Sequence, residues 1–239
     1  MEVKEKKVLV FGSGISGIGA AKLLAQHGAQ VVLYDGNEKL DKEGLLSSLG
    51  GGPKTSVVLG SFPEELLDGL DMVILSPGVP TDLPVVVEMR KRGIQVIGEV
   101  ELAYAFGKGD VLAITGTNGK TTTTSLLGEI MKNYQDNVYI VGNIGNPYTA
   151  VAGQMNENTI TVAEMSSFQL ESIVDFRPKV SAILNFTPDH LNRHHTMEAY
   201  VNAKKNIARN QGPQDYCILN YEDSLTREFG KKVKAQVLY

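Results

Sequence analysis

The sequence predicts an α/β protein of two domains, each built on a parallel sheet with helices on both faces. Short apolar runs alternate with amphipathic segments along the whole chain. Two glycine-rich loops, at Gly12 and Gly116, each follow an apolar run and precede a helical segment. Alternating strands and helices are typical of parallel sheets, and each loop opens a strand–loop–helix unit of its own. We expect the domains to join near Gly98, as domains 1–98 and 99–239.

The expected strands are short runs rich in valine, isoleucine and leucine, and the expected helices are longer and amphipathic. In chain order the strands are Lys7–Phe11, Gln30–Tyr34, Met72–Leu75, Gln95–Ile97, Val111–Ile114, Val138–Val141, Thr159–Ala163, Val180–Asn185, Tyr216–Asn220 and Ala235–Leu238. The clearest helices are Gly19–His27, Leu83–Lys91, Thr122–Asn133 and Thr196–Asn210. Since the second sheet of such a protein usually carries more strands, we expect an incomplete second domain and a chain that is part of a longer protein.

Composition narrows the class of protein. The 239 residues suffice for two domains, and the net charge of −4 comes without the basic cluster of a nucleic-acid-binding protein. No apolar run approaches the roughly 20 residues of a membrane span. The charged start, Met1–Lys7, leads directly into a strand and is no signal peptide. A single cysteine, Cys217, allows no disulfide within the chain. We therefore expect a cytoplasmic protein with no membrane or nucleic-acid partner.

The second glycine-rich loop, Thr115–Thr122, reads TGTNGKTT and is the most informative motif. Its glycines let several N–H groups point at one anion, Lys120 adds a cation, and Thr121 offers a hydroxyl to a nucleotide-bound magnesium ion. Ile114 stands where the common phosphate loop has its first glycine, so this loop is shortened. An ordinary turn would not need Gly-Lys-Thr in this order. The loop therefore predicts nucleotide binding by a P-loop ATPase-like α/β central domain.

The first loop, Gly12–Gly17, reads GSGISG between a strand and a helix, and Asp35 ends the next strand. This pattern matches the dinucleotide fingerprint, in which glycines approach a pyrophosphate and the acidic residue contacts a ribose. It predicts a Rossmann-like amino-terminal domain. The fingerprint specifies a diphosphate and a ribose rather than nicotinamide, so both a UDP-sugar and NAD satisfy it.

Three further motifs follow expected strands, and each has a structural alternative. Ser76 and Gly78 lie where ligands of open α/β sheets bind, but they would equally form a plain turn. Glu164 suits magnesium, or it stabilises the N-terminus of the following helix. His190, in a loop with two more histidines and Arg193, could be a metal ligand or contact a transferred phosphate, or it could have a purely structural role, as single histidines more often do.

Together these motifs resemble one family closely. The shortened loop is similar to that of the ATP-dependent Mur ligases and folylpolyglutamate synthetases. Within that set, the chain resembles the ligases that add D-glutamate to UDP-N-acetylmuramoyl-L-alanine, whereas the sibling that adds L-alanine usually has histidine at the place of Asn118. The resemblance covers the whole chain and rests also on Gly12–Gly17, Ser76–Gly78, Gly98–Leu102, Gly142–Gly145 and Glu164–Glu171.

The resemblance implies ATP-driven amide bond formation through an acyl phosphate, in peptidoglycan precursor synthesis, by a monomer that uses ATP and Mg²⁺. It implies substrate contacts at Ile15, Ser16, Asp35, Gly36, Asn37, Ser76, Gly78 and Asn143. It implies ATP contacts at Gly116, Thr117, Asn118, Gly119, Lys120, Thr121 and Thr122. It implies magnesium ligands at Thr121, Glu164, His190 and a carbamylated Lys204, with Lys120, Asn143, His190 and Lys204 as the catalytic set.

Lys204 would otherwise be taken for a solvated helix lysine, so its role rests on the resemblance alone. One departure is Asn192, where the family often has aspartate. The family also has a carboxyl-terminal domain that supplies D-glutamate contacts, so we expect the 239-residue chain to be inactive alone. Two other functions remain open: a UDP-sugar-binding fragment without turnover, and an NAD-linked dehydrogenase. The second phosphate loop argues against the dehydrogenase.

Overall fold

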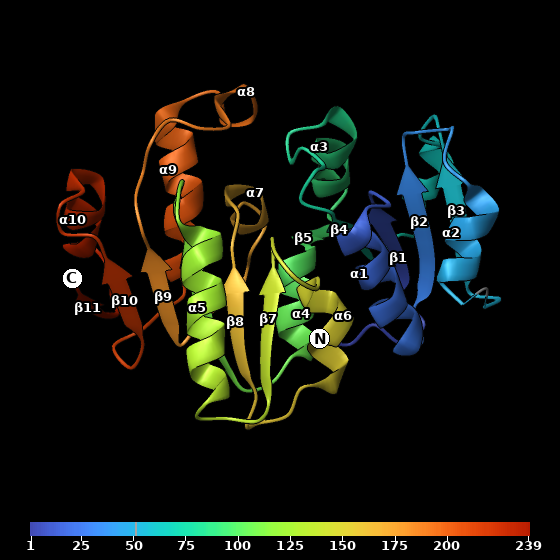
Figure 1. Cartoon of the computed structure of the whole chain (residues 1–239). Helices are drawn as coiled ribbons and strands as arrows, with labels where there is room; N and C mark the ends of the chain where they lie inside the picture. The colour runs from blue at the N-terminus through green and yellow to red at the C-terminus, as the bar shows by residue number, and fades with distance from the viewer. Residues whose placement is uncertain (51) are drawn as a thin grey trace. The chain divides into compact units, whose positions relative to one another are not determined.

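The structure, a computed structural model, describes residues 1–50 and 52–239, and its contacts divide the chain into two compact units (Figure 1). Unit 1 comprises Met1–Phe106 together with Tyr148–Gly153, and unit 2 comprises Gly107–Pro147 together with Gln154–Tyr239. The sequence placed the join near Gly98. Helix α4 (Glu99–Phe106) follows that point but packs with unit 1, so the division by contacts falls one helix later.

Unit 1 contains a parallel sheet in the order β3-β2-β1-β4-β5. Its strands are β1 (Lys7–Phe11), β2 (Gln30–Asp35), β3 (Thr55–Leu59), β4 (Met72–Leu75) and β5 (Gln95–Gly98). The chain runs outward from β1 in one direction and then restarts at β4 on its other side. The loops after β1 and β4 therefore flank the switch point of the sheet, where ligands of such folds bind.

Helices cover both faces of this sheet. Leu9 and Phe11 of β1 face a buried cluster that includes Val86 and Met89 of α3. Helix α1 packs on β1, β2 and β4, and it also contacts α4 and α6. The helical elements of unit 1 are α1 (Ile15–Gln26), α2 (Lys42–Ser48), the 3₁₀ turn η1 (Glu64–Leu67), α3 (Pro84–Lys91), α4 (Glu99–Phe106), α6 (Tyr148–Val151) and the 3₁₀ turn η2 (Ala152–Gln154), whose last residue belongs to unit 2.

Unit 2 contains a second parallel sheet, in the order β11-β10-β9-β6-β8-β7. Its strands are β6 (Asp110–Thr115), β7 (Val138–Gly142), β8 (Ile160–Glu164), β9 (Val180–Ile183), β10 (Tyr216–Leu219) and β11 (Gln236–Leu238). Strand β6 lies between β8 and β9. The segments that follow these three parallel strands therefore meet at one edge of the sheet.

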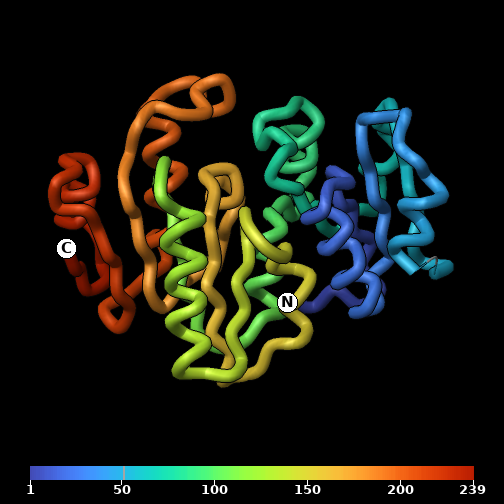
Figure 2. The backbone as a smooth tube through the Cα atoms, viewed as in Figure 1, coloured from blue at the N-terminus to red at the C-terminus, as the bar shows by residue number. Residues whose placement is uncertain are grey.

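The helical elements of unit 2 are α5 (Lys120–Lys132), α7 (Ser167–Leu170), α8 (Leu191–His194), α9 (Met197–Lys205), the 3₁₀ turn η3 (Asn206–Ala208) and α10 (Ser224–Gly230). Helix α5 packs on β6, β7 and β8. Figure 2 shows the chain rising from the end of β9 to α8 and then descending along α9. Helix α9 thus comes back past the edge of the sheet where the phosphate loop lies.

The expected parallel α/β fold is confirmed, with differences in single elements. Strand β3 was not predicted, and β9 ends at Ile183 rather than at Asn185 because Leu184 and Asn185 turn toward the phosphate loop. In the described part of the chain, no helix combines the length and the apolar character needed to cross a membrane.

Candidate functional site

The phosphate loop between β6 and α5 takes a backbone shape that requires its two glycines. Gly116 has a φ of 149° and Gly119 a φ of 83°, both in the region that side chains disfavour. A Cβ atom on Gly116 would also lie 3.0 Å from Cβ of Leu184. Lys120 begins α5 directly after Gly119, so the loop delivers its N–H groups to the N-terminus of that helix.

Asn185, just beyond β9, holds the loop in place. Its side-chain oxygen accepts hydrogen bonds from the backbone N–H groups of Thr117 and Asn118, at 3.1 and 2.9 Å. Its amide nitrogen donates back to the carbonyl of Asn118. The hydroxyl of Thr117 lies 3.0 Å from that of Tyr200 and accepts from the backbone of Thr187. The sequence motifs assign no role to Asn185 or Tyr200. A polar residue at the end of a strand beside β6 was the signal available.

Lys120 lies over the loop. Its ammonium donates a 2.9 Å hydrogen bond to the carbonyl of Thr117. The contact spans three residues and keeps the positive charge beside the N–H groups of the loop. The loop thus combines a helix N-terminus, turned backbone and a cation, which is the arrangement that binds phosphate.

Thr121, Asn143 and Glu164 are brought together beside the loop. The hydroxyl of Thr121 donates to one oxygen of Glu164 at 2.8 Å, and the amide of Asn143 donates to the other at 2.8 Å. Glu164 ends β8 and is 1% exposed. Hydroxyl and carboxylate oxygens are the ligands that magnesium takes in proteins. The donor chemistry of Thr121 and Glu164 therefore fits a nucleotide-bound magnesium ion.

Lys204 is buried at the same site, with 2% of its surface exposed. Its ammonium donates to the carbonyl of Gly116 at 2.8 Å and lies 4.9 Å from the ring centre of Tyr200. Burial and the charge of Lys120 lower its pKa from 10.5 to about 7, against the opposing effect of Asp189 and Glu164. A lysine so placed on α9 is not the solvated lysine that the helical pattern alone suggested.

His190 lies in the connection between β9 and α8, in a left-handed conformation with a φ of 51°. Its Nε2 is 3.4 Å from a carboxylate oxygen of Asp189, and its ring centre is 5.0 Å from that of Phe168. The imidazole is half exposed. Across the described residues, no three His, Cys, Asp or Glu side chains form a cluster suited to a metal ion. Among the described residues, His190 therefore belongs to no such cluster.

A second polar cluster braces this connection and had not been predicted. His194 is buried, with Nδ1 3.1 Å from Glu171 and Nε2 2.9 Å from the hydroxyl of Ser167. Burial lowers the pKa of His194, although Glu171 opposes the shift. Arg193 pairs with Glu171 at 3.0 Å and lies over the ring of Phe168. The cluster joins α7 to α8 and so fixes the chain around His190.

In unit 1 the first glycine loop and Ser76 meet at the switch point. Gly12 has a φ of 99°, and its carbonyl accepts a 2.9 Å hydrogen bond from the hydroxyl of Ser76. A Cβ atom on Gly17 would lie 1.8 Å from that same carbonyl oxygen. These two glycines allow α1 to start close behind β1, as the fingerprint predicts.

Asp35, at the end of β2, is engaged with the same loop. One carboxylate oxygen accepts from both the backbone and the hydroxyl of Ser13, at 2.8 and 2.6 Å, and the other accepts from the backbone of Asn37. Burial raises the pKa of Asp35, but the hydrogen bonds from Ser13 and Asn37 outweigh it, so the pKa is lowered. A carboxylate has about four acceptor sites, so Asp35 could take one further donor from a ligand.

The remaining expected contacts lie at the two loop edges. Ile15 begins α1 and is 77% exposed, which leaves its side chain available to a ligand. Ser16 follows it in the first turn of α1. Gly36 and Gly78 are exposed at the carboxyl ends of β2 and β4, and Thr122 is exposed in the first turn of α5. The structure thus gathers the expected substrate residues of unit 1 at one edge of its sheet. It gathers the expected ATP residues at the corresponding edge in unit 2.

Comparison with protein-family models gives two matches. Residues 114–239 match the model described as the Mur ligase middle domain. Residues 6–98 match the model described as Mur ligase MurD-like, N-terminal domain. The two models together cover both glycine loops.

Two similar curated proteins, from Lachnoclostridium phytofermentans and Lachnospira eligens, are named UDP-N-acetylmuramoylalanine–D-glutamate ligase. They are 58% and 52% identical over 98% and 100% of this chain, and the match covers 52% and 53% of their own lengths. The chain therefore spans about half the length of these relatives. A crystal structure of UDP-N-acetylmuramate:L-alanyl-γ-D-glutamyl-meso-diaminopimelate ligase from Neisseria meningitides has a TM-score of 0.65 at 17% identity. The match covers 97% of this chain and 76% of that one, and it supports the fold.

Proposed function

The chain belongs to the Mur ligase family, and from that premise we propose that it carries the substrate-binding and nucleotide-binding parts of a D-glutamate-adding ligase. The proposed enzyme joins D-glutamate to UDP-N-acetylmuramoyl-L-alanine and converts ATP to ADP and phosphate. The observation that carries the proposal is the group of Lys120, Thr121, Glu164 and Lys204 around one phosphate loop. The names of the similar proteins support the choice of D-glutamate.

In the first proposed step, a carboxylate oxygen of the UDP-linked substrate attacks the γ-phosphorus of ATP. The bond from that phosphorus to the bridging oxygen breaks, which releases ADP and leaves an acyl phosphate. The substrate carboxylate and the γ-phosphate are both anions, yet they must approach each other. Negative charge spreads over the phosphoryl oxygens as the phosphoryl group moves. Lys120 and the N–H groups of the loop would bind those oxygens and stabilise the charge.

In the second step the amine of D-glutamate attacks the acyl carbon. A tetrahedral intermediate forms and collapses to the amide with loss of phosphate, and the amine gives up a proton. The phosphate retains the oxygen that attacked in the first step. Asn143, held by Glu164, is the proposed amide contact to substrate or phosphate.

Thr121, Glu164, His190 and a modified Lys204 are the residues that we propose would hold magnesium. Magnesium, when bound, supplies positive charge against the phosphate oxygens. Lys204 is proposed to be carbamylated: its neutral amine adds CO₂, a C–N bond forms, and a proton is released. The resulting carboxylate would face Lys120, so repulsion between two cations would become attraction between opposite charges. Because Lys204 is buried, its ammonium is hydrogen-bonded to the carbonyl of Gly116 rather than to bulk water.

Product formation by the full-length protein tests this proposal. UDP-N-acetylmuramoyl-L-alanine, D-glutamate, ATP and magnesium should yield the D-glutamyl product with one ADP for each amide formed, and L-glutamate serves as the control amine. With ¹⁸O in the substrate carboxylate, one label should appear in the released phosphate. Unlabelled phosphate, or amide product formed without an equal amount of ADP, would rule out this mechanism. The same assay on the 239-residue chain is expected to give no product.

A further inference from the structure

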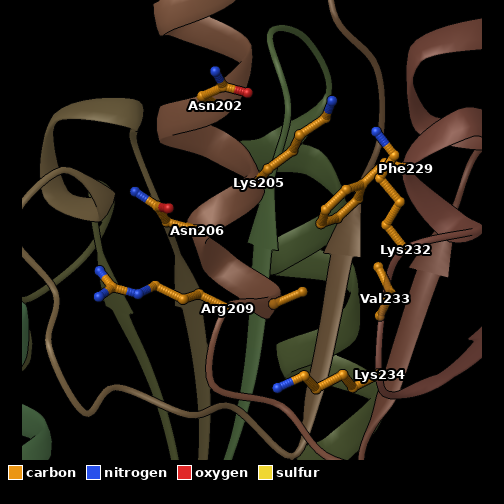
Figure 3. Close-up of a pocket in the computed structure, with 9 residues that line it drawn as sticks. Asn202, Lys205, Asn206, Arg209, Phe229, Lys232, Val233 and Lys234 are labelled. Atoms are coloured by element: carbon orange, nitrogen blue, oxygen red, sulfur yellow. The ribbon is translucent and has the colours of Figure 1, made fainter.

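Beyond the phosphate loop, charged side chains gather at two places in unit 2. One is a pocket of about 410 Å³ bordered by α9 and by the connection between α10 and β11 (Figure 3). Its basic side chains do not converge, because Arg209 points away from Lys205 and Lys234 lies at the other end of the pocket. The other place is the connection around α8, where charged and polar side chains meet at the carboxylate of Glu171.

Helix α8 is a short segment between two residues with a left-handed backbone. His190 precedes it with a φ of 51°, and His195 follows it with a φ of 64°. Neither residue is glycine, and such conformations persist only where the surrounding contacts enforce them. The backbone N–H groups of Arg193 and His194 both donate to the carbonyl of His190, so the place of α8 also sets the place of His190.

Glu171, directly after α7, holds two consecutive residues of α8. One carboxylate oxygen accepts from the guanidinium of Arg193 at 3.0 Å, and the other lies 3.1 Å from Nδ1 of His194. An ionised carboxylate can only accept, so Nδ1 carries a hydrogen and donates it. In the neutral form of the ring, Nε2 then accepts from the hydroxyl of Ser167 at 2.9 Å. Both oxygens of Glu171 are thus used to fix α8.

The ring of Phe168 carries this arrangement to His190. Its centre lies 5.0 Å from the ring centre of His190 and 5.5 Å from that of His194. The guanidinium carbon of Arg193 is 5.0 Å from the same ring centre. Phe168 therefore contacts both residues that Glu171 holds and also the imidazole of His190. A displacement of Arg193 or His194 would remove packing that supports this imidazole.

Helix α7 is itself fixed to the phosphate-loop site. It starts three residues after Glu164, and Ser166 and Gln169 form a capping box at its N-terminus. Because β8 and β9 lie on opposite sides of β6, Glu164 and His190 come from separate parts of the sheet. The contacts of Glu171 bridge the segments that follow these two strands.

We propose that Glu171 is a positioning residue for the ligase reaction, one that fixes His190 relative to Glu164 through Arg193 and His194. The proposal rests on the proposed function, in which His190 contacts magnesium or the transferred phosphate. The order Ser167, His194, Glu171 is also that of a hydrolytic triad. Ser167 is 1% exposed, however, so a substrate does not reach its hydroxyl, and the network acts on position rather than as a nucleophile.

Glu171→Gln in the full-length protein tests the proposal. Glutamine keeps the shape but replaces one accepting oxygen with a donor, so it cannot accept from both Arg193 and His194. A small displacement of His190 should lower kcat about tenfold to hundredfold. KM for ATP should stay unchanged, because the phosphate loop is intact. Glu228→Gln removes an exposed ion pair of unit 2, with Lys231 at 2.6 Å, and is the matched control that should retain the parent rate.

Two further readouts separate positioning from a general loss of stability. In the His190→Ala background, Glu171→Gln should cause no additional loss of kcat, since its effect passes through the missing imidazole. Amide exchange, followed by mass spectrometry without substrate or metal, should be faster in Glu171→Gln for residues 189–196 and unchanged in α5. Amide exchange needs no turnover, so it decides the question even if His190→Ala is inactive.

Parent kcat in Glu171→Gln, a full additional loss in the His190→Ala background, or unchanged amide exchange would each overturn the proposal. If a thermal melt shows that Glu171→Gln does not fold, Ser167→Ala carries the same three measurements, with a smaller expected loss of kcat because it removes a single hydrogen bond of the network. Failure of the proposed function is seen separately, as absence of D-glutamyl product from the parent protein.

Discussion

At the scale of single residues, the site is organised by two lysines that play different parts. Lys120 is tied to its own loop through the carbonyl of Thr117, while Lys204 reaches the same loop from α9 through the carbonyl of Gly116. Two cations near each other in a buried place repel, and only an anion between them or a change in one of them removes that repulsion. The predictions at this scale follow from that pairing.

Lys120→Ala should abolish ligation by the full-length protein. The phosphoryl group loses its cation in the transition state, and removal of one such group commonly costs about 10²–10³ in rate. Turnover is measured at saturating ATP. Lys132→Ala, at the other end of α5 and paired with exposed Glu129, is the matched control and should retain the parent rate. Half of the parent turnover in Lys120→Ala would contradict the assigned role.

Lys204→Ala should be inactive and partly rescued by formate or acetate. A short carboxylate would replace the oxygens that carbamylation is proposed to add, in the space that the side chain leaves. Activity is measured with and without each acid. The same acids should not change Lys132→Ala. Full activity of Lys204→Ala without any additive would mean that the buried amine has no part in the reaction.

The residues of the loop could be predicted from sequence because each acts through its own type and spacing, as with Lys120 and Thr121. Asn185 and Tyr200 could not. They act on the loop through backbone and hydroxyl contacts across more than sixty positions of chain. Asn185 is marked only as a polar residue beyond a strand, and no local pattern marks Tyr200. The hydrogen bonds of Glu164 settle its place beside Thr121, which its position after a strand had left open.

At the scale of elements, the start of α1 depends on close approach of two backbones. A Cβ atom on Gly17 would collide with the carbonyl oxygen of Gly12, whereas one on Gly14 would meet no heavy atom within 4 Å. Gly14 and Gly17 are three residues apart in the same fingerprint, yet only Gly17 has to be glycine for steric reasons. Sequence alone cannot separate them, because both match the motif.

Gly17→Ala should therefore destabilise unit 1, and Gly14→Ala should not. Overpacking of this kind typically costs about 1–3 kcal/mol, while a substitution into open space stays within about 0.5 kcal/mol. The measurement is the urea midpoint of each full-length variant. Equal midpoints for the two variants would show that α1 can shift away from β1 without cost.

The start of β10 is held by an acidic side chain whose effect depends on pH. Asp215 is almost fully buried and accepts hydrogen bonds from Arg177 at 2.7 Å and from the backbone of Gly212 at 2.8 Å. Burial raises the pKa of Asp215, but these donors outweigh it and the pKa is lowered below the ordinary 3.8. A carboxyl of this kind stabilises the fold above its unfolded pKa, and the contribution is lost as pH falls through the folded pKa.

Asp215→Asn should accordingly cost roughly 1–3 kcal/mol at neutral pH. The difference from the parent should shrink in acid, below about pH 3.9, the ordinary pKa of aspartate. Urea unfolding at several pH values gives the comparison, and exposed Asp136→Asn is the control. A difference that stays constant down to the acid limit would mean that the charge of Asp215 does not stabilise the fold.

Most strands were predictable because the strands of a buried parallel sheet are continuous apolar runs, such as Met72–Leu75. Strand β3 is the exception. It lies at the edge of the sheet beyond β2, and its residues Thr55 and Ser56 are polar or only partly buried, so the run is shorter and mixed. An edge strand is paired on one side only, and its pattern is correspondingly weaker.

At the scale of the whole molecule, each unit carries its own phosphate-type loop at the carboxyl edge of a parallel sheet. Unit 1 should bind UDP-linked substrate rather than NADH. Ribose and diphosphate are common to both ligands, so the contacts of Asp35 do not separate them. The expected preference rests on the match of residues 6–98 to the Mur ligase MurD-like N-terminal domain. Titration of the full-length protein with UDP-N-acetylmuramoyl-L-alanine and with NADH measures this preference. Micromolar binding of NADH without binding of the UDP-sugar would reverse the assignment.

The short helix α6 has a consequence for how the molecule is made and cut. The chain passes between units three times, after Phe106, after Pro147 and after Gly153, because α6 returns to pack on α1 and α4. During synthesis, unit 1 therefore cannot complete its packing until Gly153 has emerged. At about 5–20 residues per second, that is a wait of several seconds after Phe106. A protease that cuts once after Phe106 would leave α6 on the fragment that carries unit 2, and a cut after Gly153 would leave Gly107–Pro147 attached to unit 1, so no single cleavage separates the two units.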